Sequence, residues 1–132
     1  MPEINIWAVI AAALSAFLLG GLWYSPALFG NVWNREAGRG EKQSGGSHGA
    51  MVFGLAFVLA LIASTVFALF LGPRPALGFA TGAGFAAGLC WVATSFGINY
   101  LFAARSFKLW LIDGGYHTVQ FTLIGLILGL WH

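Results

Sequence analysis

The sequence has few charged residues, a single cysteine and no basic stretch at its start. Of its 132 residues, 8% are Asp, Glu, Lys or Arg and 59% are hydrophobic, whereas a soluble globular domain has about 25% charged residues. So few Lys and Arg residues exclude the basic surface of a nucleic-acid-binding protein. Cys90 alone excludes an intramolecular disulfide and a metal site made of several cysteines. Because Glu3 stands where a signal peptide is basic, we expect the first apolar run to remain as a membrane anchor.

Four long apolar runs fill most of the chain. A transmembrane helix needs about 20 consecutive, mainly apolar residues, and two tight breaks, at Pro73–Pro75 and at residues 103–108, separate the last three runs. The segment 24–49 contains a Gly- and Ser-rich stretch and is expected to be a flexible cytoplasmic loop. The sequence therefore predicts an all-α fold, a bundle of four transmembrane helices in a single domain of residues 1–132. The expected spans are residues 4–23, 50–71, 76–102 and 109–131.

The positive charges indicate how these helices are oriented. Four spans place the loops 24–49 and 103–108 on the same side of the membrane, and five of the six Lys and Arg residues lie there, against Arg74 on the other side. Because cytoplasmic loops are enriched in Lys and Arg, we expect both termini to lie outside the cytoplasm. The residues expected to flank the cytoplasmic interface are Trp23, Tyr24, Arg105 and Lys108.

Polar residues interrupt the last apolar run on one face. At 100° per residue, Asp113, His117 and Gln120 fall within an arc of about 60° on a helix. An ionisable group near the centre of a bilayer costs about 2.5 to 3.5 kcal/mol, so each such group needs a partner or a function. The short turn at residues 103–108 makes the third and fourth spans antiparallel neighbours. The sequence therefore predicts a polar vestibule that faces the cytoplasm and is lined by Asp113, His117, Gln120, Asn99 and Tyr100.

Small residues on the third and fourth spans predict close helix packing. Within a membrane, the close approach of two backbones and the resulting dispersion forces replace the hydrophobic effect between helices. The residues expected at such contacts are Gly84 and Gly88 in the third span and Gly125 and Gly129 in the fourth.

The polar residues have structural as well as functional interpretations. Asp113 either forms an ion pair with Arg105 or Lys108 or acts as a functional carboxylate, and His117 is either a hydrogen-bonded structural residue or a proton or ligand site. Asp113 and His117 together offer two metal ligands, which is too few, so we expect no metal and no cofactor. The serine residues lack the Gly-x-Ser-x-Gly turn of a nucleophile. We therefore expect no enzymatic activity.

Three segments resemble a known family of small bacterial membrane proteins. They are GGLWYSPALFG at residues 20–30, FGINY at 96–100 and RSFKLWLIDGGYH at 105–117. In combination they resemble the domain-of-unknown-function family numbered 1761, and the resemblance covers essentially the whole chain. It implies a four-helix integral membrane protein. It implies no established activity and supplies no catalytic residues.

Two functions remain open on these grounds. The first is a transport or channel-like protein of the bacterial inner membrane, in which the vestibule takes a proton, a cation or a small solute; the near-neutral titration of His117 suits that role. The second is a non-catalytic accessory subunit or scaffold of a larger membrane complex, in which the polar residues serve helix packing. In both cases the expected partners are the lipid bilayer and, because of the glycine-rich faces, further copies of the chain; no nucleic acid is expected.

Overall fold

The computed structural model describes residues 4–36 and 49–132, and this part of the chain contains helices and no strand. Four helices are long and apolar enough to cross a membrane, and the third of these, Leu77–Phe102, combines α4, η2 and α5. The predicted all-α bundle is confirmed. The elements are α1 (Ile6–Trp23), α2 (Gly30–Glu36), α3 (Gly49–Leu71), α4 (Leu77–Ala86), the π-helical segment η2 (Ala87–Ala93), α5 (Thr94–Phe102) and α6 (Phe107–Leu130).

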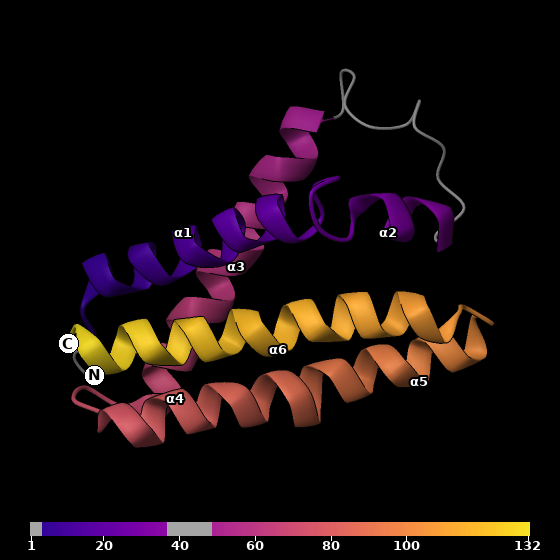
Figure 1. Ribbon diagram of the computed structural model, residues 1–132. Coiled ribbons are helices and arrows are strands. Elements are labelled where there is room, and N and C mark those ends of the chain that lie inside the picture. The colour runs from indigo at the N-terminus through magenta and orange to yellow at the C-terminus, as the bar shows by residue number, and fades with distance from the viewer. Residues whose placement is uncertain (1–3, 37–48) are drawn as a thin grey trace.

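Helix α6 is the central element of the bundle. It contacts α1, α2, α3, α4, η2 and α5, whereas α1 and α3 contact each other on one side of it. Figure 1 shows α1, α6 and the α4–η2–α5 rod lying side by side, while α3 crosses them at a steep angle. One face of α3 packs against α1, and its other faces carry large, exposed apolar residues such as Leu59 and Phe70.

Glycine residues bring α4, η2 and α6 into close contact. A Cβ atom placed on Gly84 would lie 2.1 Å from the carbonyl oxygen of Phe121, and one placed on Gly125 would lie 2.1 Å from that of Ala80. A Cβ atom placed on Gly88 would lie 2.6 Å from the His117 carbonyl oxygen, and one placed on Gly129 would lie 3.1 Å from the Cα atom of Leu77. The helix backbones touch at these points, so no larger residue fits without separating the helices.

The third long helix widens into a π-helical turn at η2. Such turns leave backbone carbonyls without their usual α-helical partners, and they occur frequently at functional sites. The hydroxyl of Thr94 donates to the carbonyls of Cys90 and Trp91, at 2.6 and 3.0 Å, and the indole of Trp110 on α6 donates to the carbonyl of Ala93 at 2.8 Å. Side chains thus satisfy the disturbed backbone at the level of the polar residues of α6.

Part of the segment expected to be a flexible loop is helical, which corrects that expectation for residues 24–36. The chain turns at residues 24–29, where the amide of Gly30 donates to the carbonyl of Ser25 at 2.9 Å, and α2 follows at once. A Cβ atom on Gly30 would lie 2.3 Å from the Tyr24 carbonyl oxygen, so this tight turn needs glycine. The Gly- and Ser-rich stretch lies outside the described residues.

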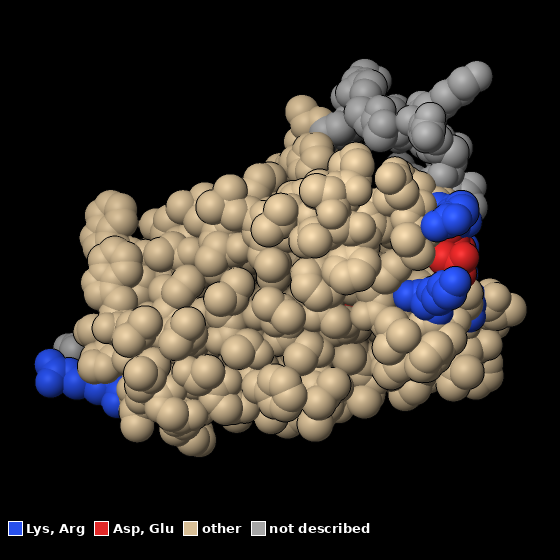
Figure 2. All heavy atoms as spheres, viewed as in Figure 1, with Lys and Arg blue, Asp and Glu red and all other residues tan. Residues whose placement is uncertain are grey.

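Apart from the buried Asp113, the charged residues that the structure describes lie at the two ends of the bundle. Figure 2 shows Lys and Arg side chains gathered at the end that holds α2 and the α5–α6 turn, with a further basic side chain at the opposite end. The residues concerned are Arg35, Arg105 and Lys108 at the first end and Arg74 at the second. The sides of the bundle between them are uncharged, as a surface in contact with lipid must be.

We expect Gly84→Ala to destabilise the bundle by about 1 to 3 kcal/mol, because the added methyl group meets backbone atoms that can move only if the helices separate. Gly82→Ala is the matched control on the same helix, since a Cβ atom there has no atom within 4 Å. Unfolding by dodecyl sulfate in mixed micelles, followed by circular dichroism, measures both. Equal midpoints for the two variants would contradict the close contact between α4 and α6.

The α5–α6 turn contains a strained residue. Ala104 has a φ of 57°, in the left-handed region, and the amides of Ala104 and Arg105 donate to the carbonyls of Leu101 and Tyr100 at 3.3 and 2.9 Å, the pattern of a Schellman helix end. That position usually holds glycine, since other residues pay about 1 to 2 kcal/mol there. We therefore expect Ala104→Gly to raise the free energy of unfolding by about 1 kcal/mol in the same assay. Ala103→Gly, at a φ of −82°, should give no gain.

Candidate functional site

Asp113 on α6 accepts hydrogen bonds from three aromatic side chains that come from other elements. Its carboxylate is buried, with 7% of the residue exposed. Oδ1 accepts from the hydroxyl of Tyr24 at 2.5 Å and from Nε1 of Trp33 at 3.0 Å, and Oδ2 accepts from the hydroxyl of Tyr100. We call these four residues the Asp113 cluster. Both carboxylate oxygens are occupied.

The Asp113 cluster ties three separate segments to α6. Tyr24 caps the end of α1, Trp33 lies on α2, and Tyr100 lies on α5. Beside it, the indole of Trp23 donates to the carbonyl of Ile112 on α6 at 2.9 Å. The rings of Tyr24 and Trp33 also pack edge to face, with centroids 5.7 Å apart. These bonds hold the α1–α2 turn and α2 against α6.

The donors around Asp113 are neutral. Burial and the hydrogen bond to Asp113 raise the pKa of Tyr24 above its usual range, so this hydroxyl keeps its proton and donates. Hydrogen bonds to a carboxylate are roughly twice as strong as those between neutral groups. Of the two alternatives for Asp113, an ion pair with Arg105 or Lys108 is therefore not needed to explain its burial, because three hydrogen bonds already stabilise it.

His117 and Gln120 form a second polar pair one turn deeper on α6. Nδ1 of His117 lies 2.6 Å from Oε1 of Gln120. The amide oxygen accepts only, so Nδ1 carries the proton and Nε2 of the neutral ring is an acceptor. Phe96 on α5 stacks on the imidazole, with ring centroids 4.9 Å apart and planes 18° apart, and Tyr116 packs against its edge. The imidazole is thus held in one orientation and one tautomer.

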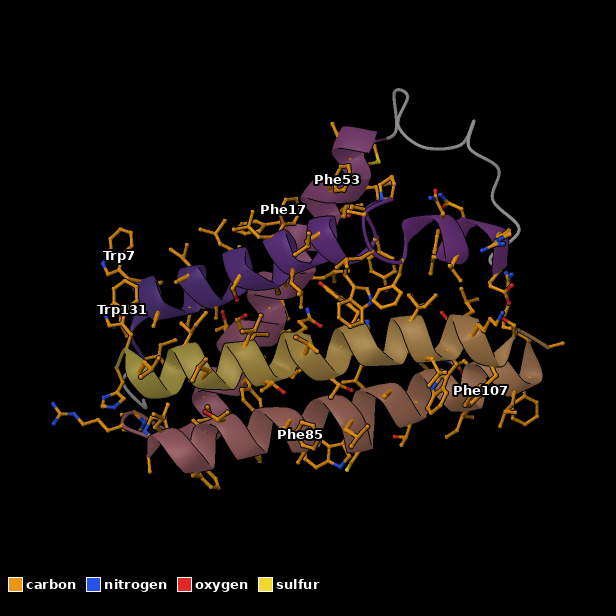
Figure 3. The ribbon with its side chains drawn as sticks, viewed as in Figure 1. Trp7, Phe17, Phe53, Phe85, Phe107 and Trp131 are labelled. Carbon is orange, nitrogen blue, oxygen red and sulfur yellow. The ribbon has the colours of Figure 1, made fainter. Side chains whose placement is uncertain are left out.

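The His117–Gln120 pair lines a cavity of about 560 Å³ between α1, α3 and α6, which we call the His117 cavity. Its other walls are mainly apolar, and Phe17 and Phe53 face each other there from α1 and α3 (Figure 3), with ring centroids 6.0 Å apart. Tyr116 also lines it, but its hydroxyl donates to the carbonyl of Ala16 at 2.9 Å. Within the described part of the chain, neither Nε2 of His117 nor the amide nitrogen of Gln120 has a hydrogen-bond partner, and neither is fully enclosed. The cavity wall therefore offers one acceptor and one donor side by side.

The five residues expected to line one vestibule lie in three different places in the structure. Asp113 and Tyr100 belong to the Asp113 cluster, His117 and Gln120 line the His117 cavity, and Asn99 is exposed on α5 outside both. The four residues expected to flank the membrane interface also lie in two different places. Trp23 and Tyr24 contact α6 and Asp113, whereas Arg105 and Lys108 are exposed at the α5–α6 turn.

Sequence reasoning missed Trp33, and it assigned Tyr24 to the interface alone. Trp33 lies 80 residues before Asp113 and in a segment taken for a loop. The available signal was an aromatic residue with an indole donor inside a polar stretch, since a buried indole usually finds an acceptor. Phe96 and Tyr116, which fix the ring of His117, were missed too. Among the described residues, no three His, Cys, Asp or Glu side chains come together as metal ligands would.

A family model with the description "Protein of unknown function (DUF1761)" matches residues 7–129. The chain belongs to this family. The DUF1761 match spans all four long helices and both polar groups, which confirms the resemblance found in the sequence. No curated protein and no solved structure matches the chain. The family description names no activity, so a function can be inferred only from the geometry of the site.

Trp33→Phe removes one donor to Asp113 and keeps an aromatic ring. We expect it to cost about 1 to 3 kcal/mol, because a buried carboxylate loses a partner, and to speed hydrogen exchange of the α2 amides by about tenfold or more. Exchange followed by mass spectrometry in micelles measures this. Trp91→Phe, at an exposed residue on η2, is the control. If α2 keeps its protection in Trp33→Phe, the indole does not anchor this helix.

Proposed function

We propose that this DUF1761 protein is a small, non-enzymatic transport protein that binds a small solute in the His117 cavity. The observation that supports this is the adjacent pair of unpartnered polar atoms, Nε2 of His117 and the amide nitrogen of Gln120, on an otherwise apolar wall. Polar groups inside a membrane cost several kcal/mol when they lack hydrogen bonds. A solute that supplies both bonds is therefore favoured there.

The chemistry of the pair defines the class of solute. Nε2 accepts a hydrogen bond and the amide nitrogen donates one, so the matching group carries a donor and an acceptor within a few ångströms of each other. An uncharged carboxylic acid, a carboxamide and an alcohol with its hydroxyl group meet this requirement. The apolar walls favour solutes whose remaining part is a short hydrocarbon. Because Nε2 of the imidazole can also accept a proton, a proton is a second species that this site can exchange.

The Asp113 cluster sets one wall of the cavity. Tyr24 donates to Asp113 with its hydroxyl and lines the His117 cavity with its ring. Movement of α2 and Trp33 therefore reaches the cavity through Tyr24. Under the positive-inside rule this end faces the cytoplasm of a bacterial inner membrane. In that orientation the cavity exchanges solute with the cytoplasmic half of the bilayer.

A non-catalytic subunit or scaffold of a larger membrane complex is the second candidate. The observation that favours it is α3, whose large apolar residues are exposed along most of the helix. In a membrane such a face packs against lipid, a second copy of the chain or a partner helix. Purification from native membranes in a mild detergent distinguishes these. A stoichiometric complex with another protein supports the second candidate, and a homo-oligomer alone counts against it.

Flux into proteoliposomes tests the transport function. With acetic acid and acetamide as probes and an internal pH dye or light scattering as readout, we expect His117→Ala and Gln120→Ala each to reduce flux by about tenfold, the value of one hydrogen bond of about 1.4 kcal/mol. Asn99→Ala is the control, because Asn99 is exposed outside the cavity. Flux equal to that of empty liposomes, or equal flux in all variants, would refute the proposal.

A further inference from the structure

A second cavity, of about 480 Å³, lies at the basic end of the bundle between α5 and the start of α6. Its lining is mainly apolar and includes Ile98, Leu101, Phe107 and Trp110, while Arg105 lies at its edge. Figure 3 places Phe107 at this end of the molecule. We call this cavity the turn groove. It shares no lining residue with the His117 cavity.

The groove is a built feature of the fold. The indole of Trp110 is fixed by its hydrogen bond to the carbonyl of Ala93 at 2.8 Å. A Cβ atom on Gly97 would lie 3.0 Å from Nε1 of Trp110, so the absence of a side chain at this position lets the indole lie against α5 as a wall. The indole wall of the groove is thus fixed by contacts within the protein.

The mouth of the groove carries positive charge. The Schellman end of α5 and the left-handed Ala104 fix the backbone of Arg105, whose amide donates to the Tyr100 carbonyl. Lys108 follows three residues later, on the first turn of α6; it is exposed and does not line the groove. Figure 2 shows that Lys and Arg gather at this end around an acidic side chain. Apolar residues beside them are strongly exposed, with Leu101 82% and Phe102 90% accessible, as residues immersed in lipid would be.

We propose that the turn groove binds one anionic phospholipid, with an acyl chain in the groove and the phosphate at Arg105. The charge at the mouth is complementary to a phosphate, and a guanidinium has five donors in a planar arrangement that suits it. Basic side chains next to the bilayer attract anionic lipids. The apolar groove takes the chain, which a free phosphate lacks. The ligand is therefore an anionic phospholipid and not a soluble anion, and this site is independent of the His117 cavity.

Native mass spectrometry of the detergent-solubilised full chain tests this, with phosphatidylglycerol and phosphatidylcholine of identical acyl chains as probes. We expect one phosphatidylglycerol per chain, bound at least about tenfold more tightly than phosphatidylcholine. Arg105→Gln should weaken phosphatidylglycerol binding about fivefold and leave phosphatidylcholine binding unchanged. Arg105→Lys keeps the charge and should retain most of the affinity.

Two matched controls separate the groove from general surface charge. Arg35→Gln removes a positive charge at the same end, and Arg74→Gln removes one at the opposite end; neither residue lines the groove, and neither variant should change binding. Equal binding of the two lipids, or an equal effect of Arg35→Gln and Arg105→Gln, would overturn the proposal. Displacement of the lipid by inorganic phosphate or by glycerophosphoglycerol at millimolar concentration would also overturn it, since it would make the site a phosphate site. Circular dichroism of each variant verifies that it is folded.

Discussion

The hydrogen bonds to Asp113 are the interaction on which the arrangement of the polar end of the bundle depends. A carboxylate placed one turn inside a membrane helix is expensive, and here three donors from Tyr24, Trp33 and Tyr100 offset that cost. Because the donors come from α1, α2 and α5, the same bonds that stabilise the charge also fix three segments against α6. The small helix α2 makes few other contacts with the rest of the bundle. The buried carboxylate of Asp113 thus holds these three segments together at one end of the bundle.

The position of His117 follows from this arrangement and from the glycine contacts on the opposite side of α6. Gly88 lets η2 touch the backbone of α6 at His117, and Phe96 stacks on the imidazole from the next turn. The Asp113 cluster holds Tyr24 on the other side, at the wall of the cavity. Between the two, the imidazole and the amide of Gln120 face an apolar space with one donor and one acceptor unused. Packing and polarity together therefore define the place where we propose that a solute binds, although α6 itself is mostly apolar.

Much of the fold could be predicted from the sequence, because apolar runs and two prolines define four membrane helices without reference to tertiary contacts. The proximity of Tyr100 to Asp113 also followed, since a short turn makes their helices antiparallel neighbours. The role of Trp33 could not be predicted in this way. It depends on a seven-residue helix with no apolar periodicity and on a contact across 80 residues. The π-helical turn at η2 and the steep crossing of α3 likewise depend on packing against neighbours, which leaves no pattern in one sequence.

The tautomer of His117 tests most directly whether the His117–Gln120 pair offers one acceptor and one donor to the His117 cavity. Nuclear magnetic resonance of the chain with isotope-labelled histidine, in lipid nanodiscs, reports which ring nitrogen carries the proton. We predict that Nδ1 is protonated and Nε2 is not, that Gln120→Ala removes this preference, and that adding a small carboxamide shifts the Nε2 signal. A proton on Nε2 in the unmodified chain, or an Nε2 signal that no such solute shifts, would contradict this prediction.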